Sequence, residues 1–164
     1  AQINQNNMDW NGRYEPKLFM PMVFSGLIEG ARGFAFYRDE IVRQRVWQHQ
    51  WIQSFSDFAT KIRTNSKFVN LLRTPHWTSY EAEPTAPTTL KYGLRELDGK
   101  LYMLVANMGP SRQRVRFQIL GYPYQLVAVK EFFRNVWVTS VSNNKFDLDL
   151  GPFETAIYWL KKRP

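Results

Sequence analysis

The sequence predicts an α+β fold in which a helix–strand–helix segment precedes an antiparallel β-sandwich. Residues 1–75 show helical spacing of apolar side chains around one short β-prone run, whereas residues 76–164 alternate with a period of two between turn formers. The chain has 164 residues, of which 44% are hydrophobic, and this is enough for one domain or two small ones. We therefore expect two units that divide near residue 75.

The first predicted helix covers residues 16–30, PKLFMPMVFSGLIEG. Pro16 suits the first helical position, Pro21 is tolerated near the first turn, and Gly30 is a natural C-terminal stop. The next run, GFAFYR at residues 33–38, is short and β-prone and predicts a strand. A lone strand leaves both rows of backbone groups unpaired, so this strand needs partner strands from outside the chain.

A long helix is predicted next, with Asp39 as its N-cap. Its apolar residues are spaced by four, four, three and four, which places them along one face. They are Trp47, Trp51, Phe55, Phe58 and Ile62. Residues 66–73, SKFVNLLR, either extend this helix or begin a short second one. Residues 74–89 contain three prolines and show neither helical nor strand periodicity, which predicts a connection without regular structure.

Seven short strands are predicted downstream, where apolar residues alternate and turn formers recur about every ten residues. The strands are residues 90–97, 99–109, 114–120, 124–133, 135–142, 145–150 and 154–162. Asp98-Gly99, Asn143-Asn144 and Gly151-Pro152 are good turn formers between them. This pattern indicates an antiparallel sandwich.

The net charge of +8 is spread along the chain. Residues 1–75 carry 10 basic and 6 acidic side chains, residues 76–164 carry 12 and 8, and each part therefore contributes +4. In the densest basic segment, RQRVRF at residues 112–117, the arginines alternate with other residues as on the solvated face of a strand. We interpret the basic C-terminal residues 161–163 as a solubilising tail. No nucleic-acid partner is expected.

Several function classes lack their sequence signals. The chain has no cysteine, which excludes disulfides, thiolate metal sites and a cysteine nucleophile. His49 and His76 have no metal-ligand spacing, and no phosphate loop, dinucleotide fingerprint or Gly-x-Ser-x-Gly occurs. No metal or cofactor is expected. No apolar run reaches the length of a membrane span, so we expect a soluble chain without a membrane partner. The sequence leaves the compartment open between secreted and cytoplasmic.

Four segments together resemble part of a known enzyme family. Residues 15–39, EPKLFMPMVFSGLIEGARGFAFYRD, resemble the end of the catalytic barrel of retaining glycoside hydrolases of the eight-stranded β/α type. There, a helix ending in a Gly-Ala-Arg-Gly-like turn precedes the eighth strand. Residues 46–63 look like the final barrel helix, and residues 90–119 with residues 151–160 are similar to the small C-terminal sandwich that follows such barrels. The resemblance covers nearly the whole chain.

The resemblance implies that residues 1–75 are the last segment of a β/α barrel and that residues 76–164 are the C-terminal β-sandwich. Such hydrolases use two carboxyl groups about 5 Å apart. The resemblance implies that these lie at the ends of the fourth and seventh strands. Residues 1–7 offer only amides, and Asp39-Glu40 is interpreted as a helix start. We therefore expect no catalytic residue in this chain.

Residues after the predicted strand are the first candidate substrate-binding site. Because barrel active sites lie at the C-terminal ends of the strands, Tyr37, Arg38 and Asp39 would face the cleft. Tyr37 would stack on a sugar ring, and Arg38 would bond a hydroxyl or orient a carboxylate. The competing interpretation is a capped, salt-bridged helix start. Trp10 and Tyr14, before the first helix, are weaker candidates for the cleft wall.

Aromatic residues of the sandwich are a second, weaker candidate, as an exposed platform for carbohydrate. They are Trp77, Tyr80, Tyr122, Tyr124 and Trp137. A flat π-face matches the apolar face of a pyranose. Aromatic residues at strand positions are usually buried, however, so packing is the favoured interpretation.

Two functional hypotheses follow. The first is a C-terminal portion of a glycoside hydrolase that completes the barrel, is not catalytic alone, and has the rest of the barrel, a second copy of itself, or carbohydrate as partner. The second is a stand-alone carbohydrate-binding or structural β-sandwich with a helical extension. The first needs an outside partner for the lone strand and the apolar face of the long helix, whereas the second needs both to pack on the sandwich.

Overall fold

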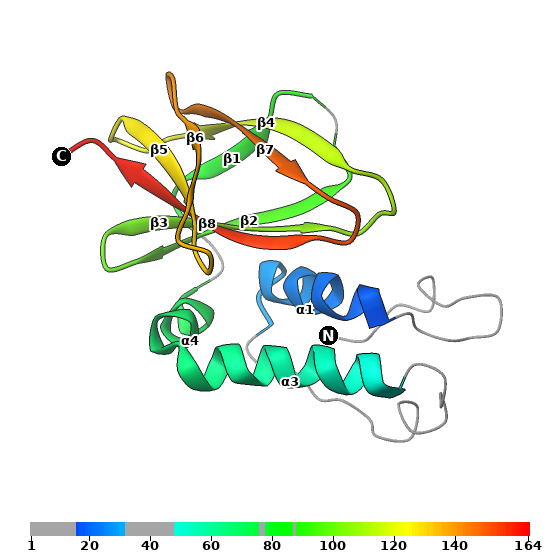
Figure 1. The fold of residues 1–164 in the computed structure, drawn as a ribbon. Helices are drawn as coiled ribbons and strands as arrows, with labels where there is room; N and C mark the ends of the chain where they lie inside the picture. The colour runs from blue at the N-terminus through cyan, green and yellow to red at the C-terminus, as the bar shows by residue number, and fades with distance from the viewer. Residues whose placement is uncertain (1–15, 32–47, 76–77, 87) are drawn as a thin grey trace.

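A computed structural model of the chain describes residues 16–31, 48–75, 78–86 and 88–164. The described part is an α+β structure in which a helical layer lies on one side of a two-sheet sandwich (Figure 1). The predicted strand at residues 33–38 and the predicted N-cap Asp39 lie outside the described residues. Within the described ranges, no helix is long and apolar enough to cross a membrane.

The first helix agrees with its prediction. A 3-10 turn, η2 (Pro16–Leu18), leads into α1 (Phe19–Ile28), and Pro21 falls in its first turn. Gly30 ends the helix with a φ of 97°, a left-handed conformation that suits glycine. Its N–H donates to the Leu27 carbonyl at 3.1 Å.

The next helical region is two helices, α3 (Gln48–Thr64) and α4 (Ser66–Arg73). The break occurs at Asn65, whose side chain accepts a hydrogen bond from the Phe68 N–H at 2.9 Å and caps α4. Of the two interpretations left open for residues 66–73, the short second helix is therefore the one observed.

All seven predicted strands are present, and an eighth precedes them. They are β2 (Leu90–Leu97), β3 (Lys100–Asn107), β4 (Gln113–Leu120), β5 (Leu126–Glu131), β6 (Trp137–Ser140), β7 (Lys145–Leu150) and β8 (Thr155–Lys162). The turns at Asp98-Gly99 and Asn143-Asn144 both adopt positive φ, between 50° and 65°, as their sequences predict.

The extra strand, β1 (Glu81–Pro84), corrects the prediction that residues 74–89 have no regular structure. It is a four-residue edge strand that pairs with β4, with Pro84 opposite Phe117. An edge strand tolerates a proline because one row of its backbone groups needs no partner strand. So short a segment carries too few residues for a periodicity to be recognised.

The strands form two antiparallel sheets. Three strands pair in the order β1-β4-β7, and five pair in the order β2-β3-β8-β5-β6. Alternate side chains of both sheets meet in the space between them, where Phe117, Leu148 and Leu160 are at most 1% exposed. This buried cluster is the core of the sandwich.

A second core lies between the helices and the outer face of the five-stranded sheet. Phe24 and Leu27 of α1 pack with Tyr102 and Leu104 of β3 and with Ile157 of β8, all at most 1% exposed. α4 adds Phe68 and Leu71, and α3 adds Phe58, to the same cluster. α1 and α4 therefore pack on the sandwich, and α3 packs on α1 and α4.

The apolar face of α3 is only partly covered. Phe58 is 4% exposed, whereas Ile52, Phe55 and Ile62 are 53%, 44% and 37% exposed. Trp47, the first residue of the predicted stripe, lies outside the described residues. Within the described ranges, α3 thus carries apolar side chains that are partly exposed, although the Phe55 ring lies 6.4 Å from the Phe19 ring of α1, centroid to centroid.

Candidate carbohydrate-binding site

The predicted barrel-side residues cannot be placed. Tyr37, Arg38, Asp39, Trp10 and Tyr14 all lie outside the described residues, and their assignment to a substrate cleft stays a prediction. Trp77 of the predicted aromatic platform lies outside them as well. The site described below is therefore built from the sandwich.

The four remaining platform residues divide into two pairs. Tyr122 is 8% exposed and belongs to the core between the sheets, and Tyr80 packs against the same core, with the two ring centroids 4.9 Å apart. This placement favours packing for both. Tyr124 and Trp137, in contrast, are 49% and 53% exposed.

Trp137 is not alone on its face of the sheet. In the register of the five-stranded sheet, Lys130 of β5 lies opposite Trp159 of β8 on one side and opposite Trp137 of β6 on the other. Cross-strand neighbours point to the same face. The two tryptophan rings lie 6.2 Å apart between centroids, tilted by 36°. The sheet therefore forms a pair of indole rings on its outer face, beside the region that the helices cover.

Lysine ammonium groups surround these rings. The Nζ atoms of Lys130 and Lys161 lie 5.0 and 5.4 Å from the Trp137 ring centroid, and that of Lys100 lies 5.6 Å from the Trp159 ring centroid. Such distances are within the range of cation–π attraction. We call these five residues, Trp137, Trp159, Lys100, Lys130 and Lys161, the aromatic–lysine surface.

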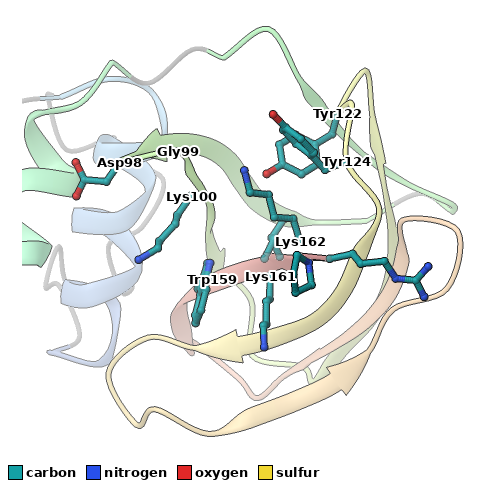
Figure 2. Close-up of a pocket in the computed structure, with 11 residues that line it drawn as sticks. Asp98, Gly99, Lys100, Tyr122, Tyr124, Trp159, Lys161 and Lys162 are labelled. Carbon is teal, nitrogen blue, oxygen red and sulfur yellow. The ribbon is translucent and has the colours of Figure 1, made fainter.

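A groove of about 580 Å³ continues from this surface around the C-terminal end of β8. Figure 2 shows Trp159 and Lys161 on one side of β8 and the rings of Tyr122 and Tyr124 on the other. Lys162 completes the tyrosine side, with its Nζ 4.0 Å from the Tyr124 ring centroid. The groove size is typical of a small-ligand site, and its open shape would accept a chain that runs past it.

Charge is distributed unevenly over the sandwich. On the three-stranded sheet, Arg112 and Arg116 form bidentate ion pairs with Asp149 and Asp147, at 2.6 to 2.9 Å. These hydrogen bonds hold the pKa of both aspartates below the ordinary value of 3.8.

The lysines of the aromatic–lysine surface have no such partners in the part of the chain that the structure describes. The nearest acidic residue on β5, Glu131, is 3% exposed and pairs with Arg134 instead. Asp98 is the carboxylate residue that lines the groove, beside Lys100, Lys161, Lys162 and Arg163. The surface is therefore cationic as well as aromatic.

The tyrosines near the surface stay neutral. Burial raises the pKa of Tyr102 and of Tyr122 above 10, and it raises that of Tyr158 further. Their hydroxyl groups are thus protonated near neutral pH. No group of three or more His, Asp or Glu residues is placed to hold a metal ion within the described ranges.

Sequence reasoning missed most of this site. Of the residues on this surface and its groove, the sequence predicts only Tyr122, Tyr124 and Trp137 as platform residues. Trp159 falls in the predicted strand at residues 154–162, and the C-terminal lysines fall in the predicted solubilising tail. The available signal was the i, i+2 spacing of Trp159 and Lys161 in a strand, which places both on one face. Strand order was also needed, because Lys130 and Trp137 reach the same face only through pairing.

Comparisons with known proteins give a likeness of fold. No family model and no curated protein matches the chain. A solved structure from Bacteroides fragilis, provisionally described as an alpha-galactosidase/melibiase, matches with a TM-score of 0.51 and 12% identity, over 90% of this chain and 29% of that one.

Two further solved structures match less well. AmyP in complex with maltotriose gives a TM-score of 0.43 and 13% identity over 72% of this chain and 21% of that one. Trehalulose synthase MutB from Pseudomonas mesoacidophila gives 0.32 and 19%, over 58% and 17%. The chain thus spans less than a third of the length of each of these three proteins.

Proposed function

We propose that the chain is the C-terminal portion of a glycoside hydrolase, in which residues 1–75 complete a β/α barrel and residues 76–164 form a sandwich packed against it. The observation that carries the proposal is the fold match over 90% of this chain to 29% of a protein provisionally described as an alpha-galactosidase/melibiase. The helical layer and the sandwich together make up that match, which supports assigning both to one larger architecture.

The uncovered side of α3 supports the same proposal. Ile52 and Ile62 present apolar side chains to solvent, and exposed apolar groups on a helix are the usual sign of a surface that packs on another element. In a β/α barrel the final helix packs between the first helix and the seventh. The missing barrel helices are therefore the occupants that we propose for this face.

In this function the chain contributes structure and ligand contacts rather than the reaction chemistry. The sequence shows no pair of carboxylates suited to glycosidic bond cleavage, and the proposal assigns both to the remainder of the barrel. Tyr37, Arg38 and Asp39, with Trp10 and Tyr14, remain the proposed contributions of this chain to the substrate cleft.

The second hypothesis, a stand-alone carbohydrate-binding or structural sandwich with a helical extension, has one observation in its favour. α1 and α4 pack on the outer face of the five-stranded sheet, and Arg95 of β2 donates hydrogen bonds to the carbonyls of Leu27 and Thr74 at their ends. Capping of the sandwich by α1 and α4 fits this hypothesis, which also requires the lone strand and the apolar face of the long helix to pack on the sandwich.

An activity assay separates the two hypotheses. The full reading frame that contains this segment and the 164-residue chain are expressed separately and tested on a panel of aryl glycosides, beginning with the α-galactoside. The proposal predicts a longer protein that hydrolyses at least one substrate and a 164-residue chain that stays at background. Hydrolysis by the chain alone would contradict it, as would a reading frame with no further barrel segment or a longer protein without hydrolase activity.

A further inference from the structure

We propose that the aromatic–lysine surface binds a uronate-containing polysaccharide, in which stacked sugar rings carry a carboxylate at their edge. The inference rests on the proposed function in taking carbohydrate as the ligand, and it adds a second binding surface, on the sandwich, together with the charge of the sugar.

Exposure of Trp137 is the first step. Its side chain is 53% exposed on the edge strand β6, so packing in the core does not account for a large aromatic residue at this position. The neighbouring ring of Trp159 is half-buried and supports it from β8. Two tilted indole rings at this spacing offer apolar faces for successive pyranose rings of one chain.

The position of the lysines is the second step. Lys130 and Lys161 hold their ammonium groups within 5.4 Å of the Trp137 ring centroid. A uronate carries its carboxylate on a ring carbon, so a uronate stacked on the indole would bring this charge within reach of the two ammonium groups that lie over the ring. An exposed cation–π contact is weak, so each ammonium can turn from the ring to the carboxylate at little cost.

Charge complementarity is the third step. The lysines here have no carboxylate partner in the described ranges, unlike Arg112 and Arg116 on the other sheet, whose charges are neutralised by aspartates. A neutral sugar would leave the ammonium groups beside the ligand without a counter-charge, whereas a uronate supplies one for each ring. The surface therefore favours the acidic sugar over its neutral form.

The groove lengthens the binding surface, so that a chain of several sugars could lie along it. It continues from Trp159 past Lys161 to Lys162 and the exposed ring of Tyr124, so it is lined by both cations and aromatic rings. Such an open path suits a chain that enters and leaves, rather than a single enclosed sugar.

Titration calorimetry of the 164-residue chain with three probes tests the proposal. The probes are a galacturonate hexamer, the same hexamer fully methyl-esterified, and a linear polyphosphate of similar charge. At low salt the galacturonate hexamer should bind at least about tenfold more tightly than the ester, because only the acid pairs with the lysines. It should also bind more tightly than polyphosphate, which has no ring to stack.

Variants assign the binding to the surface. Trp137→Ala should weaken galacturonate binding about tenfold, as expected of an aromatic anchor, and Trp137→Phe should restore part of the loss. The double variant Lys130→Ala/Lys161→Ala should weaken it about fivefold. The matched control, Arg114→Ala/Lys145→Ala, removes two cations from the three-stranded sheet and should leave binding unchanged.

The contrary results are equally definite. Equal affinity for the acid and the ester would overturn the acidic preference. Polyphosphate affinity equal to that of galacturonate, or the same loss in the control as in the lysine variant, would reduce the surface to general charge attraction. Absence of galacturonate binding would overturn the proposal outright. None of these results bears on hydrolysis by the longer protein, so failure here is distinct from failure of the proposed function.

Discussion

Arg95 holds the helical layer on the sandwich, and its removal should destabilise the protein strongly. It lies on the outer face of β2 and is 3% exposed. Its guanidinium donates to the Leu27 carbonyl at the C-terminal end of α1 and to the carbonyl of Thr74, the C-cap of α4. Two helix ends, whose dipoles favour a cation, thus share one buried arginine.

The magnitude follows from these two bonds. A hydrogen bond to a charged group contributes roughly 1.5 to 3 kcal/mol, and an unsatisfied buried carbonyl costs about 1 to 3 kcal/mol. Without Arg95, the Leu27 carbonyl still accepts the hydrogen bond from the Gly30 N–H at 3.1 Å, so this carbonyl is not left without a hydrogen bond. We therefore expect Arg95→Met to lower the free energy of unfolding by about 2 to 4 kcal/mol, and Arg95→Lys by about half of that, since lysine lacks the planar fork.

Urea unfolding followed by circular dichroism measures the change, with Arg114→Met as the control. Arg114 is exposed on β4, and its replacement should change the free energy by less than about 0.5 kcal/mol. Hydrogen exchange should rise in α1 and α4 of Arg95→Met but not in β4 or β7. A loss below about 1 kcal/mol, or exchange that rises equally in both sheets, would refute the assignment of Arg95 to the helix–sandwich contact.

Three further predictions concern other parts of the structure. Replacing Ile52 and Ile62 by glutamate should reduce self-association in light scattering while changing the free energy of unfolding by less than about 0.5 kcal/mol, because both side chains are exposed; undiminished association would contradict this. Tyr102→Phe removes a buried hydroxyl that has no hydrogen-bond partner in the described ranges, so stability should stay constant or rise by up to about 1 kcal/mol in urea unfolding, whereas a clear loss would reveal a partner. The Asp147 and Asp149 carboxylates have a pKa lowered by arginine hydrogen bonds, so their stabilisation is present above the ordinary value of 3.8 and is lost as the pH falls below it. Asp147→Asn/Asp149→Asn should therefore show a flatter decline of stability on acidification, and an unchanged decline would show that other groups cause it.

Local chemistry made the elements of the fold predictable. Gly30 ends α1, and Asp98-Gly99 and Asn143-Asn144 form turns with positive φ, because few other residues adopt this conformation easily. Alternation and the turn formers between strands identified every strand from β2 to β8, and each of these except β6 has at least one buried face. β1 was missed because four residues with a proline carry no usable period.

Pairing between distant segments was not predictable in the same way. The aromatic–lysine surface exists because β8 lies between β3 and β5, and this order brings Trp159 beside Lys130 and Trp137. The buried role of Arg95 likewise depends on how α1 and α4 approach β2. In the sequence, Arg95 occupies an ordinary strand position, and nothing local distinguishes it from the exposed arginines of β4.

The central claim, that this chain is one part of a larger barrel, is tested most directly by hydrogen exchange in α3. Exchange of its backbone amides is compared between the 164-residue chain and the protein encoded by the full reading frame. If missing barrel helices cover Ile52, Phe55 and Ile62, exchange in α3 should slow at least about tenfold in the longer protein, while the buried strands β3 and β8 change little. Equal exchange of α3 in both proteins would show that this face stays open to solvent and would contradict the account.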